Sequence, residues 1–293
     1  MNRGSLLLVL MAFLLSGCGA LVKVAYNNSD TALRLLADDY FDIEGPQADA
    51  LQAGLQRLHA WHRREELPRY ANLFEDAGAR ISRGTQRPDV LWAIESVRAR
   101  YRSLVNHAVD DAMPALATLN ADNIAALEEK FAEKNEEFRR EFLRGDAEDR
   151  ERAQVKAYSK RLSNWIGDLG PEQERITVEF IRAHPLAAQR KLEERKRRQQ
   201  DMVAILRQRG TQAELRSRLY DYFNNFERNR PPEYAEAAKR FESDFVDYVV
   251  AIDRSLSASQ RTEVVERFAR YARDFRTLAA DKRSKDAGSV AAN

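Results

Sequence analysis

The chain has 293 residues, a near balance of 48 basic and 46 acidic side chains, and a single cysteine. Without a second cysteine it cannot form an intramolecular disulfide, so packing alone must hold the fold. The balanced charge excludes the strong positive field typical of nucleic-acid binding, and we expect no nucleic-acid partner. The length allows one large domain or two smaller ones.

The first residues have the pattern of a secretory signal. Arg3 supplies a positive charge, Leu6 to Leu15 form an apolar run, and small residues precede Cys18. The run is too short to span a bilayer, which is typical of a signal peptide at 1–17 and not of an anchor. The alternative is a buried free cysteine near the N-terminus of a cytosolic protein.

The stretch Leu15-Ser16-Gly17-Cys18 resembles the lipobox of bacterial lipoproteins, in which the signal peptidase cuts before the cysteine. The resemblance implies that Cys18 carries a diacylglycerol and an N-acyl chain, which suffice for stable membrane attachment. Gly19 follows the cysteine, whereas an aspartate there usually marks inner-membrane retention. The resemblance therefore implies a lipid anchor in the outer membrane, with the protein body facing the periplasm. Apart from this covalent lipid we expect no cofactor.

Helix-forming residues dominate the rest of the chain, and we find no alternating β-branched segment. Apolar residues recur at steps of three and four, which indicates helices that each bury one face. Because the connections are short, we predict an all-α fold, an antiparallel bundle of stacked helical hairpins. About nine helices are expected, at 47–80, 87–113, 121–143, 146–167, 171–183, 185–208, 211–228, 232–254 and 258–281.

Start signals separate these helices. Ser257 and Gln260 have capping-box spacing, Asn120 can cap a helix, and Pro171 suits a first helical turn. The phrases LNADN, LGPEQ and LSASQ precede three of the helices and are similar to the Leu-Thr-x-x-Gln motif of Spy-like periplasmic chaperones, small helical cradles for unfolded clients. None of the three has the threonine. A generic helix start, with leucine as a hydrophobic staple, is the alternative.

Composition divides the chain into units. A lipid anchor and an N-terminal strap are expected at 18–45, followed by an N-terminal helical bundle at 46–184. The helix at 185–208 is highly charged in its middle, which is typical of a strut that connects two units. A C-terminal helical unit at 209–281 follows it, and the small, polar tail at 282–293 is expected to be disordered.

The segment HAWHRREELPRY, residues 59–70, places charged residues on the inward face of a helix. At 100° per residue, His62, Glu65 and Arg69 lie on the same face as the leucines that precede them. Their burial needs an explanation, because an unpaired buried charge is costly.

Other residues of this segment have simpler interpretations. Arg63 and Arg64 point elsewhere, so we expect them to be ordinary surface charges. Pro68 removes one backbone hydrogen bond and should kink or restart the helix.

A second polar residue interrupts an apolar stripe at Asn135, between Phe131 and Phe138. A buried amide needs partners, since leaving it unsatisfied costs about 1–3 kcal/mol. We predict that one buried network pairs two helices and includes an i,i+4 ion pair between a glutamate and an arginine. Its members are His62, Glu65, Arg69 and Asn135.

Two other interpretations of the insert stay open. Its charges could line a binding cleft, or His59, His62 and Glu66 could begin a metal or catalytic site. Metal-binding bundles usually repeat a Glu-x-x-His pair, which is absent, as are the common nucleophile and phosphate-binding motifs. We therefore predict neither a metal site nor an enzyme.

The stretch VAYNNSD lies close to the predicted lipid. Tyr26 could sit at the membrane interface, or the stretch could be an ordered strap that Asp30 caps.

Together, the lipobox, AYNN and WHRREELPRYA, at Trp61 to Ala71, resemble a family of uncharacterised Gram-negative lipoproteins named only for a domain of unknown function. The resemblance extends to about Leu206. It implies an α-helical periplasmic body on a lipid anchor and no particular activity.

These observations favour a protein that acts by binding, as an envelope scaffold, an adaptor or a chaperone-like cradle. Its partners would be the membrane, through the lipid, and a protein or another envelope component. The alternative is a helical-bundle enzyme or metal-binding protein that uses residues 59–69. A groove lined by several helices would favour binding, whereas a closed pocket in which His62 and Glu65 converge would favour chemistry.

Overall fold

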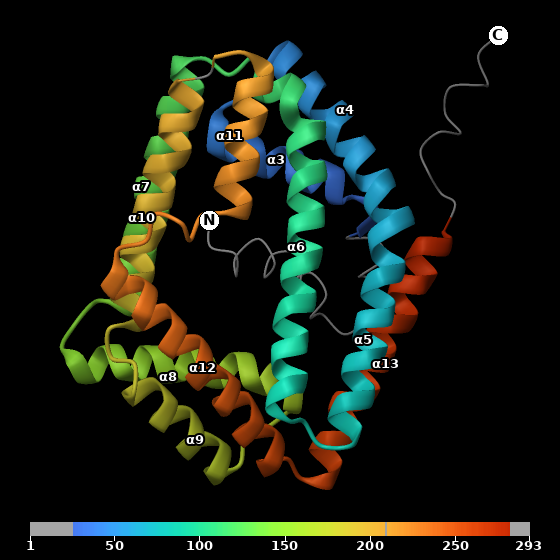
Figure 1. Ribbon diagram of the computed structural model, residues 1–293, viewed down its shortest axis with the longest axis vertical. Helices are drawn as coiled ribbons and strands as arrows, with labels where there is room; N and C mark the ends of the chain where they lie inside the picture. Colours follow the sequence, from blue (N-terminus) through green and yellow to red (C-terminus); the bar gives the residue numbers. More distant parts are fainter. Residues whose placement is uncertain (1–25, 209, 282–293) are drawn as a thin grey trace.

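The computed structural model describes residues 26–208 and 210–281, and these residues form helices and short connections without any strand (Figure 1). The all-α prediction is confirmed. Each of the nine expected helices is present, and α3 adds a tenth if α4, η1 and α5 count as one continuous helix. The elements are α3 (Ser29–Phe41), α4 (Gly45–Trp61), η1 (His62–Glu66), α5 (Leu67–Ser82), α6 (Arg87–Leu116), α7 (Ala121–Phe142), α8 (Ala147–Ile166), α9 (Pro171–Arg182), α10 (Ala187–Arg207), α11 (Gln212–Asn224), α12 (Pro232–Ser255) and α13 (Ala258–Ala280).

Several predictions fall on the part of the chain that the structure does not describe. The signal peptide, Cys18 with its lipid, and the tail at 282–293 all lie outside the described residues. Within the described ranges, none of the helices is both long and apolar enough to cross a membrane.

The helices form an open frame in Figure 1. The α7–α10 pair makes one side, the α5–α13 pair makes the other, and α6 runs between them. The lower end is built from α8, α9 and α12. The most extensive pairings join helices that are far apart in the sequence, such as α5 with α13 and α4 with α6, in addition to the expected hairpins.

Small residues let two of these pairs approach closely. A Cβ atom at Gly54 of α4 would collide with the backbone carbonyl of Asp111 in α6. On the other side, Ala71 of α5 and Ala272 of α13 are fully buried, and a Cβ at Gly78 would touch Phe268. Glycine in a helix costs about 1 kcal/mol relative to alanine, and here the close helix contact offsets that cost.

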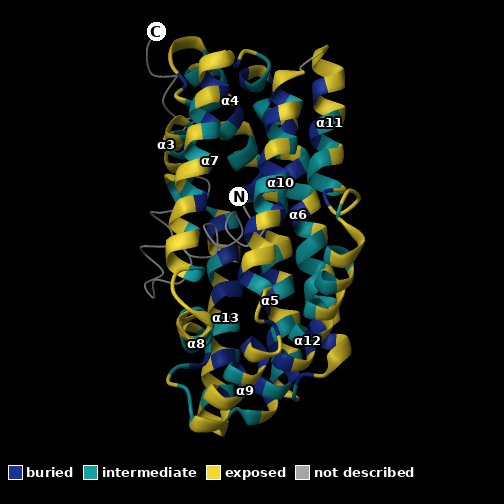
Figure 2. Ribbon diagram, turned by 90° about the vertical axis from the view of Figure 1, so that its left-hand side faces the viewer, coloured by how far each residue is buried: buried dark blue, intermediate teal, exposed yellow. Residues whose placement is uncertain are grey.

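The apolar residues form separate clusters around the frame. The largest cluster joins α4, α6, α7, α10 and α11, a second joins α5 to α13, and a third joins α8, α9, α12 and α13. Seen edge-on, the buried residues face neighbouring helices and the exposed residues face outward, as amphipathic helices require (Figure 2). The C-terminal helices thus share their cores with earlier helices, and the division into units near residue 209 stays a prediction.

The expected helix starts are present. The side chains of Asn120 and Ser257 cap α7 and α13, and Pro171 occupies the first turn of α9. The Leu-x-x-x-Gln motifs have an unexpected role. The side-chain amides of Gln173 and Gln260 form two reciprocal hydrogen bonds, at 2.8 and 3.1 Å. Each amide also reaches a carbonyl of the chain that leads into the other helix.

The third phrase forms an equivalent pair. Gln47 of α4 donates to Asn123 of α7 at 3.0 Å and to the carbonyl of Thr118, while the Asn123 amide donates to the carbonyls of Phe41 and Asp42. These two amide pairs each fix one helix start against another, which is a structural role.

Candidate functional site

The helix that begins at Gly45 changes its hydrogen bonding at the polar insert. Residues His62 to Glu66 form a π turn, in which the N–H of Leu67 bonds to the carbonyl of His62 five residues earlier. Pro68 follows at once, in the first turn of α5. Because proline has no N–H to donate, this is where an α-helical ladder would lose a bond. The predicted interruption at Pro68 is confirmed.

The π turn moves the inward position by one residue. A π turn adds a residue relative to the α-helical repeat, so Glu66 points inward and is 0% exposed. Glu65 does not point inward, and its side chain is 40% exposed. The prediction of a buried Glu65 is therefore wrong, because it assumed a constant 100° per residue.

Polar groups surround the buried carboxylate of Glu66. Its Oε1 accepts hydrogen bonds from Arg69 at 2.8 Å, from Arg100 at 3.2 Å and from the Ser103 hydroxyl at 3.0 Å. Arg100 and Ser103 belong to α6, so Glu66 ties the π turn to that helix. Arg69 also lies 3.7 Å from Glu65, the predicted i,i+4 pair, but at the surface.

His62 is buried on another side of the π turn. Its Nδ1 lies 2.9 Å from the Tyr26 hydroxyl, and its ring contacts Tyr70 edge-on. Burial, together with the smaller effects of the charges of His59 and Arg63, lowers the pKa of His62 to about 4. The imidazole is therefore neutral near pH 7.

Arg63 is a structural residue and not an ordinary surface charge. Its guanidinium donates to Asn27 at 2.6 Å and to the carbonyl of Leu278 at 2.8 Å, and it lies over the Tyr26 ring. Arg64, as expected, is exposed.

Tyr26 is ordered against the protein body, and Asn28, not Asp30, holds the N-cap position of α3. The AYNN and WHRREELPRYA motifs thus contact each other.

Asn135 does not join this network. Its Nδ2 donates to Gln199 of α10 at 2.7 Å, on the α7–α10 side of the frame and across from η1 (Figure 1). The four predicted residues therefore fall into two places. The buried pair Asn135–Gln199 does fix two helices, but they are α7 and α10.

The weak metal candidates are also divided. Glu66 faces the arginines of α5 and α6, whereas His59 and His62 face the Tyr26 ring at 4.7 and 5.8 Å. Across the described residues, no group of three or more His, Cys, Asp and Glu side chains is placed to hold a metal ion.

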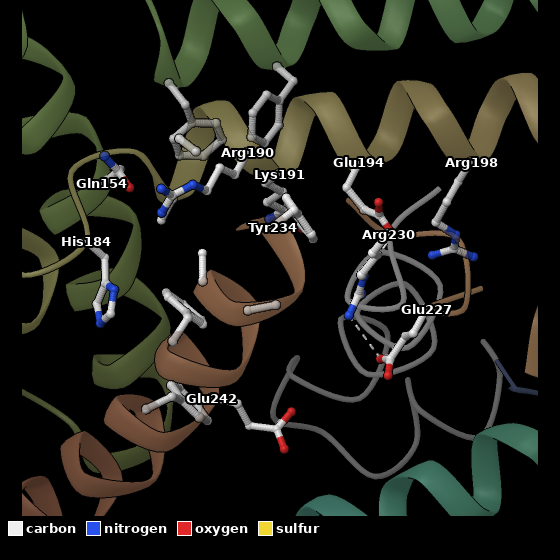
Figure 3. A pocket seen from close by; sticks show the side chains of 18 of the residues that line it. Gln154, His184, Arg190, Lys191, Glu194, Arg198, Glu227, Arg230, Tyr234 and Glu242 are labelled. Carbon is white, nitrogen blue, oxygen red and sulfur yellow. Dashed lines mark hydrogen bonds and ion pairs between the residues drawn. The ribbon is translucent and has the colours of Figure 1, made fainter. Parts of the chain in front are cut away.

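A cavity of about 470 Å³ is lined mainly by residues of α8, α10 and α12 (Figure 3). Helices α6 and α7 add further walls. Aromatic side chains supply much of its apolar lining, namely Phe138, Phe142, Tyr158, Tyr234, Phe241 and Phe245. This volume and lining are typical of sites for small molecules.

The charges of the cavity are unbalanced. Its basic side chains are Arg98, Arg161, Arg190, Lys191, Arg198 and Arg230, and its acidic ones are Glu194, Glu227 and Glu242.

All three carboxylates have arginine partners. Glu242 pairs with Arg98, while Glu194 and Glu227 lie 3.2 and 3.4 Å from Arg230. The other four cations have no carboxylate partner within the described ranges. The cavity therefore carries a surplus of positive charge.

Two of these cations have few neighbouring groups that stabilise a positive charge. Arg198 is 7% exposed, its guanidinium lies over the ring of Phe226, and its Nε has no hydrogen-bond partner. Lys191 is accessible to solvent, yet desolvation by the surrounding protein, together with the charges of Arg161 and Arg195, lowers its pKa to about 8. An anion placed among these groups would relieve both costs.

The sequence did not predict this cavity, because the charged middle of 185–208 is typical of a strut between two units. The basic run in this helix was the available signal for the cavity. Aromatic stripes on neighbouring helices could be expected to pack against it. The helix periodicity identified those stripes, but it did not show which helices would meet.

The structure thus defines an all-α protein with an aromatic, positively charged cavity between its helices. By sequence, the chain belongs to the Family of unknown function (DUF6279), whose model matches residues 39–235. The match includes the cavity walls from α6, α7, α8 and α10 and ends inside α12. No curated protein and no solved structure is similar enough to the chain to establish a relationship.

Proposed function

We propose that this chain is a lipid-anchored, periplasm-facing protein of the outer membrane, which acts by binding an envelope component in the cavity between α8, α10 and α12. The anchor rests on the signal pattern and the lipobox, with Cys18 as the lipidated residue. The binding role rests on one observation above all, the aromatic cavity with its surplus of positive charge.

The geometry of the polar insert supports binding over catalysis. Its alternative role as an active site required His62 and Glu65 to converge in a closed pocket, but His62 is buried and Glu65 faces solvent. Glu66, the carboxylate that does point inward, is fully buried and already accepts hydrogen bonds from three side chains. A substrate would have no access to it.

The binding role is tested by what the purified full chain retains. After extraction from membranes, its bound small molecules are identified by mass spectrometry of an organic extract. Ala237→Trp places a large ring in the cavity lining, and we expect it to remove the retained compound. Glu236→Trp is the control, since Glu236 is 69% exposed on the same helix. Equal retention by both variants would contradict a ligand in this cavity.

The anchor is tested separately. With Cys18→Ser we expect the chain to leave the outer-membrane fraction, because a single lipidated residue provides the attachment. Fractionation of the wild-type chain with soluble periplasmic proteins would contradict the proposed anchor without affecting the binding test.

A further inference from the structure

The lining of the cavity follows much of one helix. Its lining residues on α10 extend from Ala187 to Arg198, a distance of about 16 Å at 1.5 Å per residue. The lining residues on α12, from Tyr234 to Phe245, span a similar length. Two walls of this length suit an extended chain.

The uncompensated cations gather where α8 and α10 face each other across the cavity. Arg161 projects from α8, and Arg190 and Lys191 project from consecutive positions of α10 (Figure 3 labels the latter two). Arg161 lies over Tyr158, Lys191 lies over Phe138, and no described carboxylate pairs with any of the three cations. The charge of Arg161 disfavours the charged form of Lys191, and an anionic group between them would remove this cost.

The aromatic lining also includes residues of α12. Phe241 and Phe245 line the cavity from α12, beside Ala237 and Ala238, and offer no charge to a ligand. An acyl chain in contact with this wall would bury apolar surface, at about 25 cal/mol per Å².

From this arrangement, which rests on the proposed binding function, we infer that the ligand is a single-chain anionic amphiphile. Its carboxylate or phosphate head lies among Arg161, Arg190 and Lys191, and its acyl chain follows the aromatic wall. A free fatty acid and a lysophospholipid with an exposed phosphate share this chemistry. The net binding gain comes from pairing charges that the protein leaves unpaired, since charge-assisted hydrogen bonds are the stronger ones.

Photo-crosslinking in membranes that hold the full chain tests this inference. The probes are diazirine-labelled palmitate, its neutral methyl ester, and diazirine-labelled lysophosphatidate. We expect both anionic probes to label peptides from α8, α10 and α12. The ester should label them at least about tenfold less, because a lost charge pair of 1.4 kcal/mol is worth a factor of ten. The relative yields of the two anionic probes distinguish a carboxylate ligand from a phosphate ligand.

Charge reversal provides the matched variants. Arg161→Glu with Lys191→Glu should reduce labelling by the anionic probes at least about tenfold and leave labelling by the ester unchanged. Arg152→Glu with Lys239→Glu makes the same change in net charge at exposed sites outside the cavity, and it should have no effect. If the ester labels as well as the acids and charge reversal has no effect, the inference is wrong while cavity binding stands. If no probe labels the cavity helices, the inference is wrong. The retention test on Ala237→Trp then determines whether the proposed function stands.

Discussion

Glu66 is a carboxylate that water does not reach, and its stability depends on two arginines and a serine. Removing Glu66 leaves Arg69 and Arg100 without their acceptor, but solvent reaches both guanidiniums, so the cost is about 1–3 kcal/mol. We therefore expect Glu66→Ala to lower the free energy of unfolding by that amount. Glu65→Ala, one position earlier and at the surface, should cost less than about 1 kcal/mol. Urea denaturation of both variants measures the difference, and equal losses would contradict the register that the π turn sets.

His62 gives the protein a defined response to acid. Its pKa is about 4 in the folded chain against 6.5 for a free imidazole, so the unfolded chain binds more protons between these values. Stability is thus fully present above pH 6.5 and is lost as the pH falls to 4, by up to about 3 kcal/mol. The groups that face His62 are Tyr26, His59, Arg63 and Tyr70.

His62→Gln isolates this contribution, because glutamine can still accept a hydrogen bond from Tyr26 and does not titrate. We expect the free energy of unfolding of the variant to depend less on pH than that of the wild type between pH 6.5 and 4. Parallel pH profiles for the two proteins would mean that His62 does not carry the effect.

At the scale of the element, η1 is one extra residue accommodated in an otherwise α-helical segment. Deleting Arg64, which is exposed, should close the π turn to an α turn and keep α4 and α5 in register with their neighbours. Deleting Asp76, in the middle of α5, does not convert a π turn to an α turn. It rotates half of that helix away from α13. We expect the first deletion to fold, with a loss of helicity and stability far smaller than the second. Circular dichroism and urea denaturation compare the two, and equally damaging deletions would contradict this interpretation of η1.

The same element shows what the sequence could and could not predict. Periodicity and capping residues fixed the positions of the helices, because both signals are local. The turn at Pro68 was predictable too, but whether the backbone would kink or widen depends on the packing of Glu66 against α6. A shift of one residue then decided between Glu65 and Glu66.

At the scale of the whole molecule, helix pairing was beyond local signals. The pairing of α5 with α13 joins segments nearly 200 residues apart, and any amphipathic helix could in principle cover either one. Arg63 was assigned to the surface because its partners, Asn27 and the end of α13, are distant in sequence. The cavity was unpredictable for the same reason, since its walls come from five helices whose arrangement only the fold defines.

The arrangement also orients the protein body relative to its proposed anchor. Tyr26 is held at His62 and lies eight positions after Cys18, so the proposed lipid would attach within about 29 Å of η1 even if that stretch is fully extended. A fluorescent label at Arg64, an exposed residue of η1, should therefore lie close to the bilayer. A label at Glu148, an exposed residue at the start of α8 across the frame from η1, should lie farther away (Figure 1). With nitroxide-bearing lipids in the membrane, we expect stronger quenching at position 64 than at position 148. The Cys18→Ser variant, added to the same membranes, should show little quenching at either site. Stronger quenching at 148 would mean that α8 and the cavity, and not η1, lie nearest the membrane.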